Sequence, residues 1–210
     1  MRSTSLAASN STPRRKSASA TAAWPEPAVP ARRIRSLSAA KIGKLTFVVG
    51  GPEAAVERCG PIFAVLSERI LRAGTAGSGQ AAVALADFLR GVELLAASEV
   101  MRIGQRFGLE AGMVLDIGEG LGAIGPAMGG MLRRQVLTRQ FDSGLAFGHL
   151  LKSLETAGNV AQACGVESPL LAACRNAWAA AEARLGSGAD QTALIRWLET
   201  LAPAAAKSEA

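Results

Sequence analysis

The sequence predicts a mainly α-helical domain with a small αβ segment at its N-terminal edge. Between Ser78 and Phe107, apolar residues recur with a period of 3.6 residues, which predicts one helix of roughly 40–45 Å at ~1.5 Å per residue. Five shorter helical segments follow: 110–117, 126–138, 147–164, 168–185 and 189–201. Ahead of the long helix, short β-branched runs bounded by glycines are typical of strands.

The αβ segment is expected to begin at Gly43. The run LTFVV (45–49) predicts a strand, and Pro52 followed by Glu53 predicts the start of a helix, because proline is well tolerated in the first helical turn. The run RILRAG (69–74) then predicts a second short strand.

The long helix carries one apolar stripe and ends at Gly108. A helix of this length forms a spine around which others pack, or it reaches a partner. The stripe consists of Val83 or Ala82, Leu85, Phe88 or Leu89, Val92, Leu95, Val100, Ile103 and Phe107. Farther along the chain, Pro169 and the glycines at 186–188 bound one helix, and Asp190 is a plausible N-cap of the next.

Charge and composition exclude several classes of protein. The net charge is +6, but residues 1–44 contribute +8 and residues 45–210 contribute −2. Because the folded part is slightly acidic, we expect no nucleic-acid partner. The run 73–86 is the longest without charge and is too short for a membrane span. Three cysteines without metal-ligand spacing and a single histidine indicate neither a disulfide framework nor a metal site.

The chain divides into four parts by composition. Residues 1–42 are a basic, low-complexity leader that we expect to be disordered, 43–76 are the αβ segment, 77–202 the helical domain, and 203–210 a disordered tail. The leader is acid-poor and rich in Arg and Ser, which fits an organelle transit peptide and equally an out-of-frame readout. Cytoplasmic localisation is the default expectation, with the mitochondrion as the alternative.

Two glycine clusters are candidate ligand loops. GLGAIG (120–125) is a literal GxGxxG and, with the residues before it, resembles the first motif of S-adenosylmethionine-dependent methyltransferases. Its flanks favour a glycine-rich connection between helices, because that motif needs a strand before it. GTAGSGQ (74–80) has the better context, since a strand precedes it and a helix N-terminus follows it. It is either a ligand-facing loop or a simple turn.

Two basic side chains in FGHLLKSLETA (147–157) are further candidates. Lys152 is either a solvated surface residue or a ligand contact, and His149 is either a packing residue or a chemical one.

Taken in order, these segments resemble the C-terminal helical half of the β-hydroxyacid dehydrogenases, the family of 3-hydroxyisobutyrate dehydrogenase and tartronate semialdehyde reductase. The resemblance covers residues 43–200 and implies a helical domain like the C-terminal domain of 6-phosphogluconate dehydrogenase, joined by a long inter-domain helix to a remnant of a Rossmann domain. It implies NAD or NADP as cofactor, with cofactor contacts at Lys152, Gly77 and Gly79, and substrate contacts at Gln80 and Asp87. The closing segment GSGADQTALI (186–195) matches as well.

The sequence departs from the family at the residues that do its chemistry. The family's general acid–base lysine directly follows GQAA (79–82), where this chain has Val83. Asp87 stands where the family has a substrate-binding asparagine, and Ser153 stands where an aspartate usually follows the cofactor lysine. Residues 1–40 contain no strand–GxGxxG–helix unit, and PARRIRS (30–36) replaces the family's Ser-Gly-Gly loop.

The resemblance implies hydride transfer between NAD(P) and a small 3-hydroxy acid as the ancestral reaction. The departures from the family predict that this chain is inactive or very weak and has no catalytic residue of its own. An alternative is a non-catalytic helical module that forms a homodimer, or associates with a full-length relative, through apolar helix faces. A methyltransferase is the third interpretation.

Overall fold

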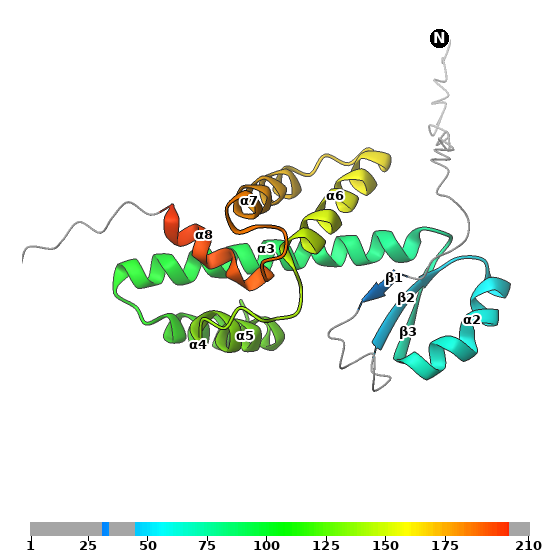
Figure 1. The fold of residues 1–210 in the computed structure, drawn as a ribbon, viewed down its shortest axis with the longest axis horizontal. Coiled ribbons are helices and arrows are strands. Elements are labelled where there is room, and N and C mark those ends of the chain that lie inside the picture. The colour runs from blue at the N-terminus through cyan, green and yellow to red at the C-terminus, as the bar shows by residue number, and fades with distance from the viewer. Residues whose placement is uncertain (1–30, 34–44, 202–210) are drawn as a thin grey trace, which may run out of the picture.

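The computed structural model of the chain describes residues 31–33 and 45–201. In Figure 1 a small αβ unit lies at the N-terminal end of one long helix, α3 (Ser78–Phe107), and the remaining helices gather along the rest of that helix. This arrangement is the mainly α-helical fold with an αβ edge that the sequence predicts.

The predicted elements of the αβ unit are confirmed. Strand β2 (Leu45–Gly50) runs parallel to β3 (Ser67–Gly74), and α2 (Glu53–Leu66) connects them. Pro52 occupies the N-cap of α2. A small core fills the space between sheet and helix, where the Phe47 and Phe63 rings lie 5.1 Å apart between centroids.

One element lies inside the segment that was expected to be disordered. Residues 31–33 form strand β1, which pairs antiparallel with β2, so the sheet order is β1-β2-β3. For these three residues the expectation was wrong, because backbone pairing with β2 supplies order that their own composition does not indicate. The remainder of the predicted leader, 1–30 and 34–42, and the predicted tail, 203–210, lie outside the described residues.

All five helical segments predicted after α3 are present, and two of them are split. The elements are α4 (Ala111–Gly120), α5 (Pro126–Met131), the π-helix η1 (Leu132–Leu137), α6 (Phe147–Ala163), α7 (Pro169–Leu185), the 3₁₀-helix η2 (Gln191–Ala193) and α8 (Leu194–Thr200). The segment 126–138 thus becomes α5 and η1, and 189–201 becomes η2 and α8. Apolar periodicity alone does not distinguish these helix types.

A single hydrophobic core holds the helices together. Phe147 and Trp178 are fully buried with ring centroids 4.8 Å apart. The short helix α8 contributes a compact apolar group to the same core, comprising Leu194, Ile195, Trp197 and Leu198.

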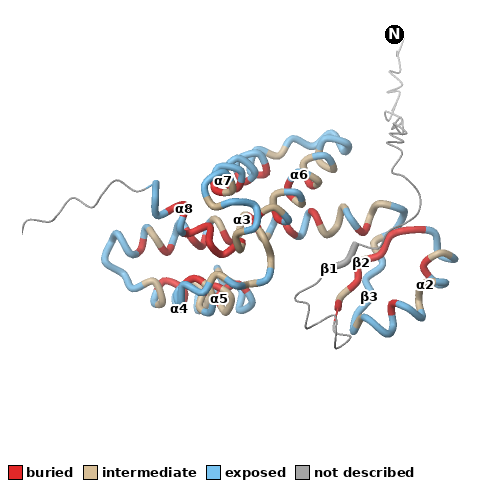
Figure 2. The backbone as a smooth tube through the Cα atoms, viewed as in Figure 1, coloured by how far each residue is buried: buried red, intermediate tan, exposed pale blue. Residues whose placement is uncertain are grey.

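The long helix α3 has two apolar faces, and the structure buries the one with the smaller residues. Its buried residues are Gly79, Ala84, Asp87, Gly91, Leu94, Ala97, Ser98, Met101 and Gly104. Most of the larger apolar residues that form the sequence-defined stripe instead face solvent: Leu85 is 47% exposed, Ile103 68% and Phe107 84%. Figure 2 shows buried and exposed stretches alternating along α3. Three other residues of the stripe, Phe88, Val92 and Leu95, are half-buried and pack against the core. The stripe therefore coincides only in part with the face that packs on the bundle.

Asp190 ties the start of η2 to a loop 47 residues earlier in the chain. Its carboxylate accepts hydrogen bonds from the backbone N–H groups of Ser143 (2.8 Å) and Gly144 (3.1 Å), and from that of Thr192 (2.9 Å). The Ser143 hydroxyl donates to the same carboxylate. Asp190 is thus the N-cap that the sequence predicts, and it also fixes the base of the α6–α7 hairpin.

Candidate functional site

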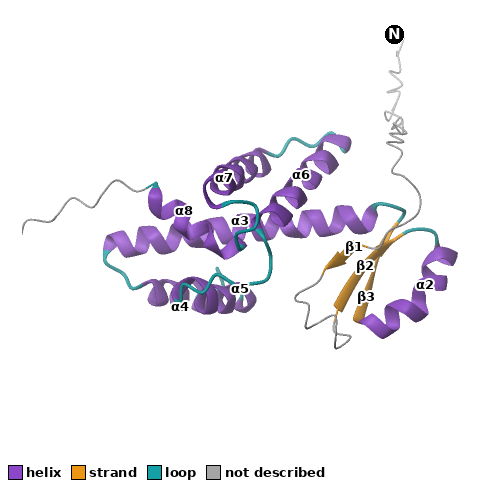
Figure 3. Ribbon diagram, viewed as in Figure 1, coloured by secondary structure: helices purple, strands orange, loops and turns teal. Residues whose placement is uncertain are grey.

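The glycine turn between β3 and α3 has the context that the sequence predicts. β3 ends at Gly74, whose φ is +111°, and Gly77 precedes α3 with a φ of +84°; Figure 3 shows the short loop that joins this strand to the helix. No side chain caps the N-terminus of α3. The first N–H groups of the helix therefore have no side-chain acceptor, an arrangement that suits an anionic group.

Gly79 lies where α3 packs directly on β2. A Cβ at this position would lie 2.7 Å from the Val48 carbonyl oxygen and 3.2 Å from the Gly50 nitrogen. The absence of a side chain is thus required by helix–sheet packing. The neighbouring Gln80 is exposed.

The next turns of α3 carry the position where the family has its lysine. Val83 is half-buried, and Asp87, one turn later, is 8% exposed. The Arg90 Nε atom lies 3.6 Å from the Asp87 carboxylate and is itself buried. Arg90 is not among the site residues predicted from the sequence, although its i,i+3 spacing from Asp87 is the signal that predicts an ion pair on a helix.

Lys152 belongs to a different helix. It is exposed on α6, which packs against α3, and it is the only lysine among residues 45–201. Its backbone carbonyl accepts a hydrogen bond from the Thr156 hydroxyl at 2.9 Å. His149 is also exposed on α6. The structure therefore gathers Gly77, Gly79, Gln80, Val83 and Asp87 along the first turns of α3 and presents Lys152 from a neighbouring helix.

A hollow of about 400 Å³ lies at the carboxyl ends of β2 and β3, next to the glycine turn. Across it, the Arg72 guanidinium donates two hydrogen bonds to the Glu53 carboxylate, at 2.9 and 2.8 Å. The full lining is Gly51, Pro52, Glu53, Arg72, Gly74, Thr75 and Ala76. The residues predicted to contact ligands do not line this hollow.

The second glycine cluster has no strand before it. Gly120 is the last residue of α4, and Pro126 begins α5, so GLGAIG connects two helices. The strand–turn–helix context that a methyltransferase motif requires is missing here. The glycine-rich helix connection favoured by the sequence is confirmed.

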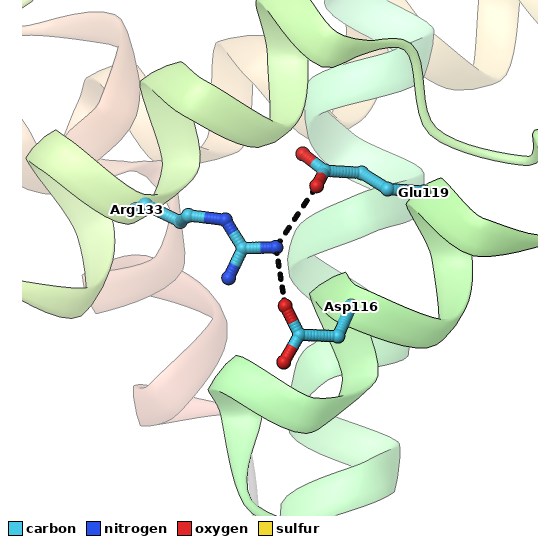
Figure 4. Close-up of polar contacts among 3 residues, drawn as sticks. All are labelled: Asp116, Glu119 and Arg133. Atoms are coloured by element: carbon cyan, nitrogen blue, oxygen red, sulfur yellow. Dashed lines mark hydrogen bonds and ion pairs between the residues drawn. The ribbon is translucent and has the colours of Figure 1, made fainter.

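Beside this connection, Arg133 joins η1 to α4. Its Nη2 atom donates to Asp116 at 2.8 Å and to Glu119 at 3.0 Å (Figure 4). The hydrogen bond to Glu119 is the main cause of a raised Arg133 pKa. Both carboxylates are satisfied by this one guanidinium, which indicates a link between helices rather than a ligand site.

Two other kinds of structural feature are absent from the described part of the chain. Among residues 31–33 and 45–201, no helix has the length and apolarity needed to cross a membrane. Within the same part of the chain, no three His, Cys, Asp or Glu side chains lie close enough together to hold a metal ion.

Comparison with known proteins gives a consistent result. A sequence model of the family described as "NAD-binding of NADP-dependent 3-hydroxyisobutyrate dehydrogenase" matches residues 77–198. The chain is 31% identical over 140 residues to a probable mitochondrial 3-hydroxyisobutyrate dehydrogenase of Arabidopsis thaliana, covering 63% of this chain and 40% of that protein. It is 28% identical over 171 residues to the 2-hydroxy-3-oxopropionate reductase of Escherichia coli, covering 78% of this chain and 56% of the relative.

Solved structures agree on the fold. A 3-hydroxyisobutyrate dehydrogenase of Mycobacterium tuberculosis, solved with L-serine, superposes with a TM-score of 0.68 at 23% identity, covering 80% of this chain and 60% of that chain. The chain spans about half the length of the curated relatives that it matches. With more than half of its residues matched by the family model, the chain belongs to the 3-hydroxyisobutyrate dehydrogenase family, whose cofactor is NAD or NADP.

Proposed function

We propose that the chain is a hydroxyacid dehydrogenase domain whose proton-transfer position is disabled, so that its turnover is at most trace. The observation that carries this proposal is Val83, which stands on α3 where the family has its general acid–base lysine. An isopropyl side chain neither accepts nor donates a proton, and general acid–base catalysis typically contributes about 10²–10⁴-fold to a rate.

The neighbouring ionisable groups do not replace that lysine. Lys152, the only lysine among residues 45–201, lies on α6 and not on α3. Asp87 is on the correct helix, but it faces Arg90 at 3.6 Å. A carboxylate in the asparagine position repels an acidic substrate.

The residues present are better suited to binding an anionic dinucleotide than to transferring the hydroxyl proton of a substrate. Lys152 offers an exposed cation, and the N-terminus of α3 offers backbone donors after the open turn at Gly77. When bound, NAD(P) supplies or accepts the hydride. This chain's own residues would bind and orient the cofactor without moving the hydroxyl proton of a substrate.

The test is a turnover assay on the purified 210-residue chain with 3-hydroxyisobutyrate or 2-hydroxy-3-oxopropionate, and with each nicotinamide cofactor. NADPH binding is measured in parallel by fluorescence, so that a failure to bind is separated from a failure to react. We expect no more than traces of turnover. Turnover at the rate of an active family member measured alongside would overturn the proposal.

A second candidate function is a non-catalytic helical interaction module. The specific observation in its favour is the solvent-exposed apolar face of α3, where Leu89 is 69% and Phe107 84% exposed. Sedimentation of a clean monomer that binds no apolar dye would count against it.

For localisation we propose the cytoplasm, with the mitochondrion as the alternative if residues 1–42 act as a transit peptide. Fractionation of cells that produce the tagged chain distinguishes the two, and recovery in the mitochondrial fraction would refute the first.

A further inference from the structure

The hollow at the carboxyl ends of β2 and β3, here called the strand-end hollow, is lined by residues 51–53, 72 and 74–76. We infer that it binds a small zwitterion of the class of a free α-amino acid, with the ligand carboxylate on Arg72 and the ligand ammonium on Glu53. None of the predicted cofactor or substrate contacts lines it, and the inference therefore does not depend on the proposed hydride-transfer chemistry.

The first argument is the position of the strand-end hollow. In open α/β sheets, ligands bind in the crevice outside the carboxyl ends of the strands. Strands β2 and β3 are parallel, and the start of α2 and the turn that leads into α3 lie at this edge of the sheet (Figure 1). That turn begins the glycine cluster GTAGSGQ (74–80), a candidate ligand loop in the sequence. Its first three residues, Gly74, Thr75 and Ala76, line the hollow.

The second argument is the space that the strand-end hollow offers. Its volume of about 400 Å³ lies near the lower end of the range for ligand pockets, about 300–1,000 Å³, which suits a small molecule. The Gly51 N–H donates a hydrogen bond to the Gly74 carbonyl at 2.8 Å. Neither glycine has a side chain that would fill the hollow, so space is available beside its charged residues.

The third argument is the charge of the lining. Glu53 and Arg72 are the only charged residues that line the strand-end hollow, and the guanidinium donates two hydrogen bonds to the carboxylate, at 2.9 and 2.8 Å. Both side chains are exposed, Glu53 to 71% and Arg72 to 38%. Because water screens an exposed ion pair, the pair contributes little net stability and opens at little cost.

A zwitterion can replace this ion pair without leaving a charge unpaired. Its carboxylate would accept two hydrogen bonds from the planar Arg72 guanidinium, and its ammonium would donate to the Glu53 carboxylate. A simple anion on Arg72 would place its charge beside the carboxylate of Glu53, and a simple cation on Glu53 would place its charge beside the guanidinium. The two opposite charges therefore favour an amino acid over a ligand with either charge alone.

The test is an NMR titration of the unmodified 210-residue chain with L-alanine, propionate and ethylammonium at constant ionic strength. Propionate and ethylammonium are close to L-alanine in size, and each carries only one of its two charges. We expect saturable shifts of the backbone amide signals of Gly51, Glu53, Gly74 and Thr75. The dissociation constant should be lower for L-alanine than for either other probe by about fivefold or more. Equal affinity for the three probes, no saturable shift, or shifts centred on α3 and α6 would refute the inference.

Two variants test the assigned contacts. Glu53→Gln and Arg72→Gln should each raise the dissociation constant of L-alanine by about fivefold or more, because each removes the charge from one hydrogen-bonding partner. The matched control is Glu199→Gln, which alters another exposed Arg–Glu pair, with Arg139, outside the hollow. The control should bind L-alanine as the parent does. Unchanged affinity in either hollow variant that keeps the parent's circular dichroism spectrum would contradict the assigned contacts.

Discussion

Trp178 on α7 donates its indole N–H to the backbone carbonyl of Gly91 on α3, at 3.2 Å. This buried hydrogen bond crosses the bundle at its centre, where α3 lacks a side chain. The two residues are 87 positions apart in the sequence, so the glycine and the tryptophan are fitted to each other only in the folded domain.

Replacing Gly91 by a larger residue should destabilise the domain, and the loss of stability should grow with the size of the new side chain. We expect Gly91→Val to lower the free energy of unfolding by about 1–3 kcal/mol, because the added methyl groups overpack a site where a Cβ already meets three side chains at 3.4 Å. Gly91→Ala, the matched control, should stay within ~1 kcal/mol of the parent, because the Cβ fits and alanine favours helix. Urea unfolding of both variants measures the difference, and equal stabilities would contradict the packing account.

A second glycine, Gly79, tests the contact between α3 and the sheet. Gly79→Ala should cost about 1–3 kcal/mol, because its Cβ would lie 2.7 Å from the backbone carbonyl oxygen of Val48, which is not free to move aside. In Gly112→Ala in α4, the added Cβ would meet only the Leu137 side chain, at 3.9 Å. The free energy of unfolding should therefore rise by about 0.5–1 kcal/mol, because alanine favours helix more than glycine does. We expect thermal unfolding to show a lower melting temperature than the parent for Gly79→Ala and a higher one for Gly112→Ala.

Lys152→Ala should weaken NADPH binding by about tenfold, since a hydrogen bond to a charged group contributes about 1.5–3 kcal/mol. Arg184→Ala removes an exposed cation from the last turn of α7 and serves as the control for loss of charge alone. Fluorescence titration with NADPH measures both variants. If the two substitutions weaken binding equally, Lys152 has no specific role at the cofactor.

Val83→Lys alone should leave turnover at traces. The new lysine would lie one helical turn before Asp87, and a carboxylate at that spacing holds an amine in its charged form, which cannot accept the hydroxyl proton when a 3-hydroxy acid is oxidised. Val83→Met is the control for side-chain length. A gain of about 10²–10⁴-fold over the parent chain in steady-state assays would show that the lysine is the only defect.

Cys174 makes the stability of the domain depend on pH in the alkaline range. Burial raises the pKa of its thiol from 9.0 to about 11. The folded state thus binds the thiol proton more tightly than the unfolded chain does. This contribution to stability is fully present below pH 9 and is lost as the pH rises from 9 towards 11. Urea unfolding should show the loss, and Cys174→Ala should remove this component of the pH dependence.

Much of the fold could be predicted from the sequence because its boundaries are set locally. The expected bounds of α3 are those observed, since Gly77 and Gly108 both adopt positive φ at its ends. Strand β1 was missed because residues 31–33 are ordered by their partner strand and not by their own apolar pattern. Periodicity identified an apolar stripe from Val83 to Phe107 on α3 but did not reveal that a second face, rich in Gly, Ala and Ser, packs on the bundle.

Less of the candidate site could be predicted. The turn at Gly77 follows from its strand–helix context, but the packing requirement at Gly79 depends on how closely α3 approaches β2. The ion pair between Asp87 and Arg90 depends on which face of α3 is buried. The roles of Lys152, Gln80 and Asp87 toward a ligand stay predictions.

The position of α8 has a consequence for synthesis on the ribosome. Its four apolar residues complete the core beside α3, yet they lie about 100 residues after Leu94 and Met101, two of the α3 residues of that core. Translation proceeds from the N-terminus, so α3 emerges long before α8. For that interval the nascent domain exposes apolar α3 surface on both sides, which makes it a substrate for chaperones until α8 arrives.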